Sequence, residues 1–556
     1  MRFRGLAEAA IVVTAAVVLA CVFTYPYIIN FSNAGRLDTN DGRWSIWVVS
    51  WVAHALTTDP LGLFRANIFY PHPNALAFSE GNIVAGAIGA PVWLLTRNPY
   101  ATHNFVFLFA FTLSFVAAYY LVRRLTGDRR AAVLAGIMFA YCPFAFVRQA
   151  HIQLLMIGFL PWCLLAWHRF IDHASVPRAI ELGVVMWLTG LACAYYGIFA
   201  GGMIAMAVLW FAFTRQRWKD MRYWTAVAVA AAVCIGLTAP FFLPYLQMQQ
   251  ATGFQRELSG QYSANLGAWL LSSAWAHRWW APYLWQPSEG LFPGILALCL
   301  GCWGATLVRD RDGIGLRRDE SWYYVGLALF TFWLTLGPKA GLYTALYYTV
   351  PVFSFLRAPS RAGIVVTLCL VVLAAPALSV LMRRPPWGTR VGGTGRAVNA
   401  AFAILLVLVV ADLYRAPLRM RTAPPLASVY TTLARLPRGP VIELPYWSEN
   451  VAYHRHAEYM LLSTAHWQPL VNGYSDHIPQ DFRDNALPLS GFPSRDSFAI
   501  LEQLGARYAV FHLDLMGADA RKALVARIEN DYLGYLRPLE KDGDVWLYEI
   551  VAWPKN

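Results

Sequence analysis

Long hydrophobic runs separated by short polar breaks occupy the first three quarters of this 556-residue chain. Most of these runs approach the length of about 20 apolar residues that a helix needs to cross a bilayer. The pattern therefore predicts a bundle of transmembrane helices. After Arg415 the pattern changes to mixed charge and short alternating segments, without another apolar run long enough to span a membrane.

The direction of each crossing follows from the basic residues in the polar breaks, which cluster at 123–130, 215–222, 309–318 and 383–390. Cytoplasmic loops carry an excess of Lys and Arg. We therefore expect these breaks, and the N-terminus with Arg2 and Arg4, to lie in the cytoplasm. Alternation then predicts eleven crossings, near residues 8–30, 100–122, 131–148, 152–170, two within 179–213, 223–246, 291–308, 321–337, 361–382 and 397–414.

The first external loop, residues 31–99, contains two apolar segments that alternation does not count as crossings. One, at 81–96, is short and interrupted by Gly and Pro. The other lies near 44–57, and we expect both to be helices at the membrane interface. Tryptophans favour that interface, and the second segment carries three of them: Trp44, Trp47 and Trp51.

Two later external loops, at 247–290 and 338–360, are rich in aromatic residues. The first contains Trp269, Trp275, Trp279, Trp280 and Trp285, and the second contains Tyr343, Tyr347, Tyr348, Phe353 and Phe355. An aromatic belt at the membrane surface is the common explanation for such residues. Stacking on sugar rings is the alternative, and it makes Trp279 a candidate for substrate contact.

Residues 1–415 are thus predicted to form a transmembrane domain, and residues 416–556 a separate small α/β domain. Strand-like runs at 440–444, 508–511 and 545–548 alternate there with helical stretches near 425–436, 496–505 and 516–530. The predicted fold class is an α-helical polytopic membrane protein with a small C-terminal α/β domain. An odd number of crossings places that domain outside the cytoplasm.

Composition and charge agree with a membrane protein and exclude several other classes. The chain is 58% hydrophobic and 14% charged, and its mean hydropathy is +0.42. The net charge of +13 belongs to the cytoplasmic breaks, so it does not indicate a nucleic-acid partner. All eight cysteines lie in apolar segments, and we interpret Cys299 and Cys302 as packing residues rather than a metal site.

The predicted helix interiors contain almost no ionisable residues, whereas an ion-coupled carrier needs carboxylates at mid-membrane. Asp412 lies near an external helix end, and Glu181 near a cytoplasmic one. The sequence also lacks a phosphate-binding loop, a nucleophile elbow and a zinc-protease motif. The chain therefore carries no machinery for nucleotide hydrolysis.

The first external loop supplies two candidates for a catalytic base, Asp38 and Asp41. A carboxylate within hydrogen-bond reach of an acceptor hydroxyl raises the nucleophilicity of that hydroxyl. In the alternative interpretation both carboxylates are solvated, or Asp41 caps a helix that begins near Arg43. The local sequence does not separate these readings.

Further candidates for substrate contact lie at external positions. His72 and Glu80 are in the first loop, where they are also candidate ligands, with an aspartate, for a divalent cation such as Mg²⁺ or Mn²⁺. Their spacing matches no metal motif, so a structural role in the loop is the alternative. His151 lies at an external helix end, and Tyr195 and Tyr196 precede Gly197, where we expect a tight external turn.

Three arginines are candidates for binding a phosphate. Arg357 and Arg361 flank a Pro-Ser turn at the external start of a predicted helix, and Arg256 lies in the tryptophan-rich loop. A guanidinium group binds a phosphate through two parallel hydrogen bonds. The alternative is that these side chains extend to the headgroups of membrane lipids.

Several segments resemble bacterial multi-pass glycosyltransferases of the C-type fold, abbreviated GT-C. The stretch Asp41-Gly42-Arg43-Trp44, continuing through Trp47 and Trp51 to His54, is similar to their first external loop, as are Asp59-Pro60 and Ala66 to Pro71. Further matching stretches are Pro99 to Asn104, His151 to Leu155, Phe355 to Arg361 and Val471 to Ser475. This GT-C superfamily includes protein O-mannosyltransferases, oligosaccharyltransferases and the aminoarabinose transferase of lipid A.

The resemblance implies a polyprenyl-phosphate sugar donor used on the outer face of the membrane, and a base in the first loop. The resemblance favours Asp41 over Asp38 as that base, because of the spacing of Asp41 to Trp47 and Trp51. Two residues separate these aspartates, so the paired-aspartate pattern of the superfamily is not reproduced and a metal requirement stays open. The acceptor is a hydroxyl group on a glycan, lipid or protein.

Our working hypothesis is therefore a transferase in a bacterial cell membrane, with Asp41 as the base and Arg357, Arg361 and Arg256 near the donor phosphate. The alternative is a non-catalytic flippase or handler of lipid-linked polysaccharide intermediates. That alternative shares the basic breaks and aromatic loops, but it does not require the first-loop aspartate.

Overall fold

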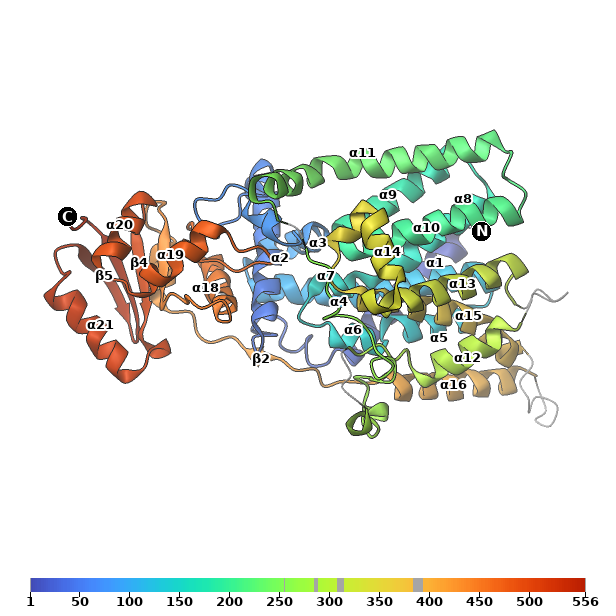
Figure 1. Ribbon diagram of the computed structural model, residues 1–556. Helices are drawn as coiled ribbons and strands as arrows, with labels where there is room; N and C mark the ends of the chain where they lie inside the picture. Colours follow the sequence, from blue (N-terminus) through green and yellow to red (C-terminus); the bar gives the residue numbers. More distant parts are fainter. Residues whose placement is uncertain (1, 255, 285–288, 308–314, 384–393, 556) are drawn as a thin grey trace. The chain divides into compact units, whose positions relative to one another are not determined.

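The computed structural model describes residues 2–254, 256–284, 289–307, 315–383 and 394–555, which form two compact units (Figure 1). The first unit comprises Met1–Ile29, Val106–Phe242 and Gln255–Leu418; the second comprises Asn30–Phe105, Leu243–Phe254 and Arg419–Asn556. Contacts thus group the first polar loop with the C-terminal residues. The domain boundary at residue 415 stays a prediction.

The first unit is built from helices. They are α1 (Arg2–Phe23), most of α4 (Pro99–Thr126), α5 (Arg129–Ala140), α6 (Pro143–Val147), α7 (Ile152–Leu155), α8 (Phe159–Asp172), α9 (Val176–Ala192), α10 (Ala194–Thr214), most of α11 (Met221–Thr252), α12 (Ile295–Ala305), α13 (Arg318–Thr335), α14 (Leu342–Thr349), α15 (Gly363–Arg383) and α16 (Thr394–Leu413).

Within the described residues, eight helical segments are long and apolar enough to cross a membrane, so the chain is a multi-pass membrane protein. These segments are Gly5–Phe23, Pro99–Thr126, Arg129–Val147, Ile152–Asp172, Ala194–Thr214, Met221–Thr252, Pro359–Met382 and Gly395–Leu413. The other three predicted crossings also form helices, but α9 has 17 residues, α12 has 11, and α13 begins with three charged residues. Trp285 and most of the basic break at 383–390 lie outside the described residues.

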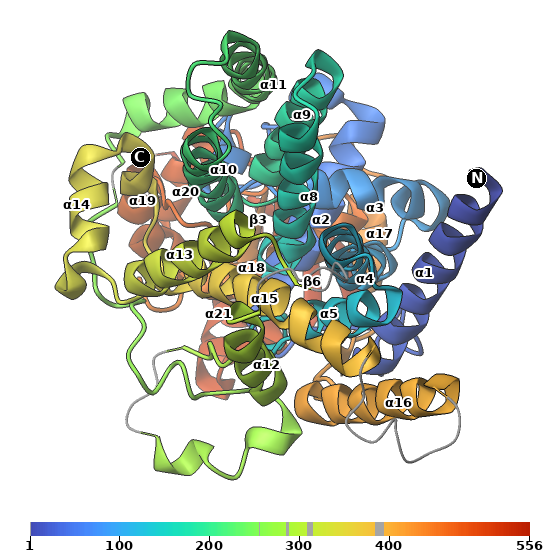
Figure 2. The same cartoon turned by 90° about the vertical axis from the view of Figure 1, so that its right-hand side faces the viewer.

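Helix α15 forms the centre of the first unit and packs against α12, α13 and α5, as Figure 2 shows. Its span is among the most apolar segments of the chain, and about four fifths of it is buried inside the protein. Small residues allow this close packing. A Cβ atom on Gly304 of α12 would lie 1.9 Å from the Leu373 carbonyl oxygen of α15.

The run at 179–213 divides into two helices, as predicted, but the break lies at Cys193 rather than at Tyr195–Gly197. Cys193 adopts an extended backbone between α9 and α10. Tyr195 and Tyr196 therefore belong to the first turn of α10. Gly197 lies against the backbone of α9, because a Cβ atom there would lie 2.6 Å from the Cα of Gly190.

The charge of Asp412, near the end of α16, is used structurally. Its carboxylate accepts hydrogen bonds from the backbone N–H groups of Ile295 and Leu296, at 3.2 and 3.0 Å, and so satisfies the start of α12. It also pairs with His277 Nε2 at 2.7 Å. A structural role explains this buried carboxylate.

The second unit combines helices with a small mixed sheet. Its main elements are α2 (Asn40–Thr58), α3 (Ile83–Thr96), α17 (Ser428–Leu433), α18 (His456–Leu462), α19 (Gln480–Ser490), α20 (Arg495–Gln503), α21 (Ala518–Asn530), and strands β1 (Ala34–Gly35), β2 (Arg421–Thr422), β3 (Val441–Leu444), β4 (Tyr508–His512), β5 (Leu536–Asp542) and β6 (Val545–Ile550). Strands β1 and β2 pair antiparallel. The four-stranded sheet has the order β3-β4-β6-β5, with β3 parallel to β4 and the other pairs antiparallel.

The mixed sheet confirms the predicted α/β character of the C-terminal residues. Strands β3, β4 and β6 coincide with the three predicted runs, and α17, α20 and α21 with the predicted helices. The fourth strand, β5, was not predicted. It forms a hairpin with β6 around Gly543, whose φ of 57° favours glycine.

A network of polar side chains lies inside this sheet. Glu443 of β3 is fully buried and accepts from His512 of β4 at 2.8 Å and from the Tyr430 hydroxyl at 3.2 Å. The Asn472 side chain accepts from the Glu443 N–H at 2.7 Å and donates to the Glu443 carbonyl at 2.9 Å. It therefore links β3 to the Val471–Ser475 stretch.

Acidification should destabilise the second unit through His456, which is fully buried. Burial lowers the pKa of His456 to about 4. Its Nε2 donates to the Trp447 carbonyl at 3.1 Å, and its Nδ1 accepts from the Asn472 side-chain amide at 3.1 Å. A second proton, on Nδ1, would place an N–H donor against the NH2 donor of Asn472. Because the unfolded chain protonates near pH 6.5, stability should fall by about 3 kcal/mol between pH 6.5 and pH 4.

Thermal unfolding of the full protein between pH 7.5 and pH 4.5 measures this loss. His456→Gln should flatten the pH dependence, although half-buried His466, whose pKa is lowered to about 3 by desolvation, contributes in the same direction. An unchanged slope in the variant would refute the assignment to His456.

Candidate functional site

The aspartates of the first loop lie at the start of α2, which begins at Asn40, earlier than the predicted start near Arg43. The capping residue is Thr39, whose hydroxyl accepts from the Gly42 N–H at 3.1 Å. The interpretation of Asp41 as the cap is therefore wrong. Asp41 lies instead in the first turn of the helix, and it is half-buried.

Asp38 is held by Arg36. The Nε and Nη2 atoms of Arg36 donate to the two carboxylate oxygens of Asp38, at 2.8 and 3.2 Å. Burial by itself raises the pKa of Asp38, but the hydrogen bonds and charge of Arg36 outweigh burial and hold the pKa below its usual value. A carboxylate in such a pair is a weak proton acceptor, so this contact counts against Asp38 as the base.

Gly42 allows the two aspartates to adopt this arrangement. A Cβ atom on Gly42 would lie 2.0 Å from the carbonyl oxygen of Arg36 and 2.7 Å from its Cβ. The backbone of residue 36 therefore packs directly on the first turn of α2. The close approach of the Arg36 backbone therefore leaves no room for a side chain at position 42 of the Asp41-Gly42-Arg43 stretch.

Gly42→Ala should lower the stability of the protein by about 1–3 kcal/mol, because the added methyl group displaces the Arg36 backbone. Helix propensity alone predicts the opposite sign, a gain of up to about 1 kcal/mol. Thermal unfolding distinguishes the two. Gly326→Ala is the matched control, since Gly326 lies inside helix α13 and a Cβ atom there meets nothing within 4 Å. Equal behaviour of both variants would contradict the clash.

The tryptophans of α2 were predicted to anchor the helix at the membrane interface, but they are buried in the protein. Trp44, Trp47 and Trp51 are each at most 9% exposed. Trp47 Nε1 donates to Asn67 Oδ1 at 3.2 Å, and Trp51 Nε1 donates to the Leu63 carbonyl at 3.0 Å. They are core residues of the second unit and fix the helix that carries Asp41.

In the first unit, the structure brings together three residues that the sequence nominated separately: Tyr195, Arg357 and Arg361. The Tyr195 hydroxyl accepts from the Arg357 backbone N–H at 3.0 Å. The guanidinium carbon of Arg361 lies 4.3 Å from the centre of the Tyr195 ring, a cation–π contact. The first turn of α10 thus supports both arginines.

The turn that carries the arginines is fixed by further hydrogen bonds. Tyr343 donates to the Leu356 carbonyl at 2.6 Å, and the Ser360 N–H donates to the Tyr262 carbonyl at 3.2 Å. The guanidinium carbon of Arg357 lies 5.6 Å from the centre of the Tyr262 ring. Aromatic residues of the external loops therefore support the backbone of this turn.

Two polar atoms of this turn are buried without a hydrogen-bond partner among the described residues: Nε of Arg361 and Oγ of Ser360. A buried donor left unsatisfied costs about 1–3 kcal/mol. A bound anion would satisfy both atoms, since each can donate a hydrogen bond. We call Tyr195, Arg357, Ser360 and Arg361 the arginine cluster.

Other predicted substrate residues have structural contacts. The Tyr196 hydroxyl donates to the Leu154 carbonyl at 2.6 Å, and the side chain is fully buried. His151 precedes α7, and its N–H donates to the Arg148 carbonyl at 2.9 Å. The Arg256 carbonyl accepts from Tyr347, and Trp279 is 68% exposed beside Trp280. The substrate contacts of Tyr196, His151 and Trp279, and the contact of Arg256 with the donor phosphate, stay predictions.

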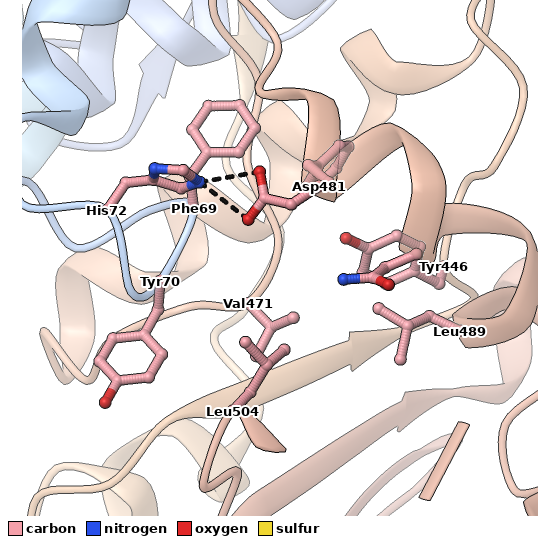
Figure 3. Close-up of a pocket in the computed structure, with 10 residues that line it drawn as sticks. Phe69, Tyr70, His72, Tyr446, Val471, Asp481, Leu489 and Leu504 are labelled. Carbon is pink, nitrogen blue, oxygen red and sulfur yellow. Dashed lines mark hydrogen bonds and ion pairs between the residues drawn. The ribbon is translucent and has the colours of Figure 1, made fainter. Parts of the chain in front are cut away.

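His72 pairs with a residue that the sequence did not nominate, Asp481 of α19. His72 Nε2 lies 3.0 Å from both carboxylate oxygens of Asp481, as Figure 3 shows. The pair lines a cavity of about 20 Å³ with Tyr446 and Phe482, enough for one water molecule. It also lines a second cavity of about 650 Å³. Glu80 lies outside the lining of both cavities.

The sequence carries a signal close to Asp481. The Val471–Ser475 stretch, which carries part of the resemblance, ends six residues before Asp481. The backbone of residues 470–472 pairs with the first loop: the Phe69 N–H donates to the Asn472 carbonyl at 3.0 Å, and the Tyr70 N–H to the Leu470 carbonyl at 2.9 Å. Gly473 permits this pairing, because a Cβ atom there would lie 2.7 Å from the Phe69 ring.

The metal site considered for His72 and Glu80 has no ligand set in the described part of the chain. In those residues, no three side chains of the types His, Cys, Asp and Glu gather closely enough to hold a metal ion. We therefore derive no catalytic step through a divalent cation.

Comparison with known proteins identifies the family. The family described as "Domain of unknown function (DUF6311)" matches residues 12–414. The chain belongs to the DUF6311 family. A search of the curated proteins gave no match to this DUF6311 protein.

Solved structures identify the fold of this DUF6311 protein. A mutant arabinofuranosyltransferase AftD from Mycobacteria matches with a TM-score of 0.58 and 16% identity, over 98% of this chain and 41% of AftD. ArnT from Cupriavidus metallidurans in the apo state matches with a TM-score of 0.50 and 16% identity, over 99% of this chain and 100% of ArnT. The chain thus spans less than half the length of AftD.

These likenesses confirm the predicted fold class: a helical membrane protein with a GT-C-like fold and a small C-terminal mixed sheet. Identities of this size concern the fold alone. They support the resemblance to C-type glycosyltransferases at that level, without assigning a sugar or an acceptor to the DUF6311 protein.

Proposed function

We propose that this protein is a membrane glycosyltransferase that moves a sugar from a polyprenyl-phosphate donor to a hydroxyl acceptor on the outer face of the membrane. The observation that carries the proposal is the arginine cluster. Its buried, unpartnered Arg361 Nε and Ser360 Oγ atoms match the donors that a lipid-linked phosphate requires. The GT-C-like fold, shared with an arabinofuranosyltransferase, supports the same reaction class.

In the proposed reaction, Asp41 accepts the proton of an acceptor hydroxyl. The hydroxyl oxygen forms a bond to the anomeric carbon, and the bond between that carbon and the phosphate oxygen breaks. Negative charge then accumulates on the departing lipid phosphate, which Arg357 and Arg361 stabilise. Attack opposite to the leaving phosphate inverts the anomeric centre.

The proposed reaction gives Asp38 a supporting role, because its carboxylate is already paired with Arg36. We also propose that the N-terminus lies in the cytoplasm and that residues 416–556 lie on the extracytoplasmic side of a bacterial cell membrane. The acceptor is a glycan, lipid or protein hydroxyl. Arg256 is retained as a candidate for the donor phosphate, and the candidates for substrate contact are His72, Glu80, His151, Tyr195, Tyr196 and Trp279.

Membranes that contain the protein, supplied with labelled polyprenyl-phosphate hexoses or pentoses, test this proposal. We expect label in an acceptor product that is absent from membranes lacking the protein. Movement of intact donor lipid across the bilayer, without breakage of the sugar–phosphate bond for any donor, would contradict a transferase and indicate a carrier of lipid-linked sugars.

A further inference from the structure

The second unit contains a cavity of about 650 Å³ that lies outside the arginine cluster and the start of α2. Its walls come from three segments: residues 72–78 of the first loop, 247–254 at the end of α11, and 477–483 at the start of α19. This volume lies in the range of about 300–1,000 Å³ that is typical of small-molecule sites.

Hydrogen bonds fix the three walls relative to one another. The His477 N–H donates to the Phe78 carbonyl at 2.9 Å, and Ser79 Oγ donates to Asp476 at 3.2 Å. The Tyr245 hydroxyl of α11 accepts from the Gly81 N–H at 2.9 Å. Because backbone groups take part in two of these contacts, the fold of the second unit fixes the shape of the cavity.

The polar groups of the cavity suit ligand hydroxyls. Asp481 is bound by His72, yet its side chain is 54% exposed and can accept further hydrogen bonds. Asn74 Nδ2 donates to Gln247 Oε1 at 3.3 Å. This bond uses one side-chain donor and one side-chain acceptor. The side-chain carbonyl oxygen of Asn74 and the side-chain NH2 group of Gln247 therefore remain for a ligand hydroxyl that both donates and accepts.

Aromatic rings form the other part of the lining. The His477 ring makes edge contacts with Phe78 at 5.3 Å and with Phe254 at 5.1 Å between centroids. Its Nε2 is buried and lacks a hydrogen-bond partner in the described chain. Apolar rings beside a few directed polar groups are the usual composition of a specific small-ligand site.

We infer that this cavity binds a neutral carbohydrate of about two to three sugar units, because its volume is typical of sites for small molecules. Asp481, Asn74 and Gln247 bind its hydroxyl groups, and Phe254 contacts an apolar face of the sugar. That this carbohydrate is part of the acceptor rests on the proposed function; the binding itself does not.

The charges favour a neutral sugar over an anionic ligand. The carboxylate of Asp481 opens into the cavity and repels anions, and burial lowers the pKa of His477, which keeps that ring neutral. Arg483 is the one arginine or lysine among the described residues of the lining, and it is exposed. The negative charge of Asp481 and the positive charge of Arg483 offset each other, so these side chains offer a phosphate or carboxylate ligand no net positive charge.

Saturation-transfer NMR on the full protein in nanodiscs tests this inference with neutral di- and trisaccharides of glucose, galactose, mannose and arabinose as probes. We expect saturation transfer to at least one probe. Asp481→Asn should weaken its binding by about 10- to 100-fold, because a charge-assisted hydrogen bond is lost. Ala251→Trp, at an exposed position of the lining, should abolish binding by filling the cavity.

Asp496→Asn is the matched control, since Asp496 occupies the first turn of α20 as Asp481 does that of α19. Its probe binding should equal that of the wild type. Absence of saturation transfer to every probe, or equal binding by Ala251→Trp, would overturn the inference. Probe binding without sugar transfer would contradict the proposed function alone, and transfer without probe binding would contradict this inference alone.

Discussion

Asp41→Asn should lower the rate of sugar transfer by about 10²–10⁴-fold, the contribution typical of a general base. Asparagine has nearly the same shape as aspartate but cannot accept the proton of the acceptor hydroxyl. The helix start should survive, because Thr39 rather than Asp41 caps α2. Initial rates in proteoliposomes with saturating donor lipid measure the effect on kcat.

Asp38→Asn is the control for this prediction. Asp38 is paired with Arg36 at 2.8 Å, so its replacement should reduce the rate by less than about tenfold, through a weakened loop rather than a lost base. A larger loss in Asp38→Asn than in Asp41→Asn would reverse the assignment of the base.

Arg361→Ala should raise the KM for the donor lipid by about 10- to 100-fold, the cost of losing a charge-assisted hydrogen bond. It should also lower kcat, because the departing phosphate gains negative charge as the bond breaks. Arg361→Lys keeps the charge but loses the planar fork, so it should recover only part of the donor affinity. Donor titrations in proteoliposomes measure both constants.

Arg415→Ala provides the matched control, since Arg415 also stacks on an aromatic ring, with its guanidinium carbon 4.2 Å from the centre of Trp275. Its replacement removes a cation–π contact of the same unit without touching the arginine cluster. Equal increases of KM in both variants would indicate a general loss of packing and would refute phosphate binding by Arg361.

Hydropathy predicted the helical framework well because the membrane imposes a simple rule on length and apolarity. The runs near α4, α11 and α15 each form one long helix. The same rule fails for α12, which has 11 residues where a span of 291–308 was predicted. Hydropathy registers the apolar residues of a segment but not where its helix begins.

Local residue types were ambiguous or misleading in two places. Thr39 and Asp41 are both suitable caps by residue type, and the structure shows that the Thr39 hydroxyl accepts from the Gly42 N–H. Strand β5 was missed because its sequence contains Pro538 and four charged residues. Pairing with β6 outweighs that low strand propensity.

The candidate sites show the same division between local and long-range information. The sequence nominated Tyr195 separately from the pair Arg357 and Arg361, but the contact between Tyr195 and Arg357 joins residues 162 positions apart in the chain. His72 and Asp481 are 409 positions apart. Such pairs depend on the tertiary fold, so residue type and spacing suggested candidates but not their partners.

The release of polyprenyl phosphate, counted together with donor binding in the same proteoliposomes, tests the central claim most directly. The account predicts one polyprenyl phosphate released for each sugar transferred by the wild type. Asp41→Asn should bind the donor with unchanged affinity while releasing polyprenyl phosphate only at the background rate. Release by Asp41→Asn at the wild-type rate would contradict the account.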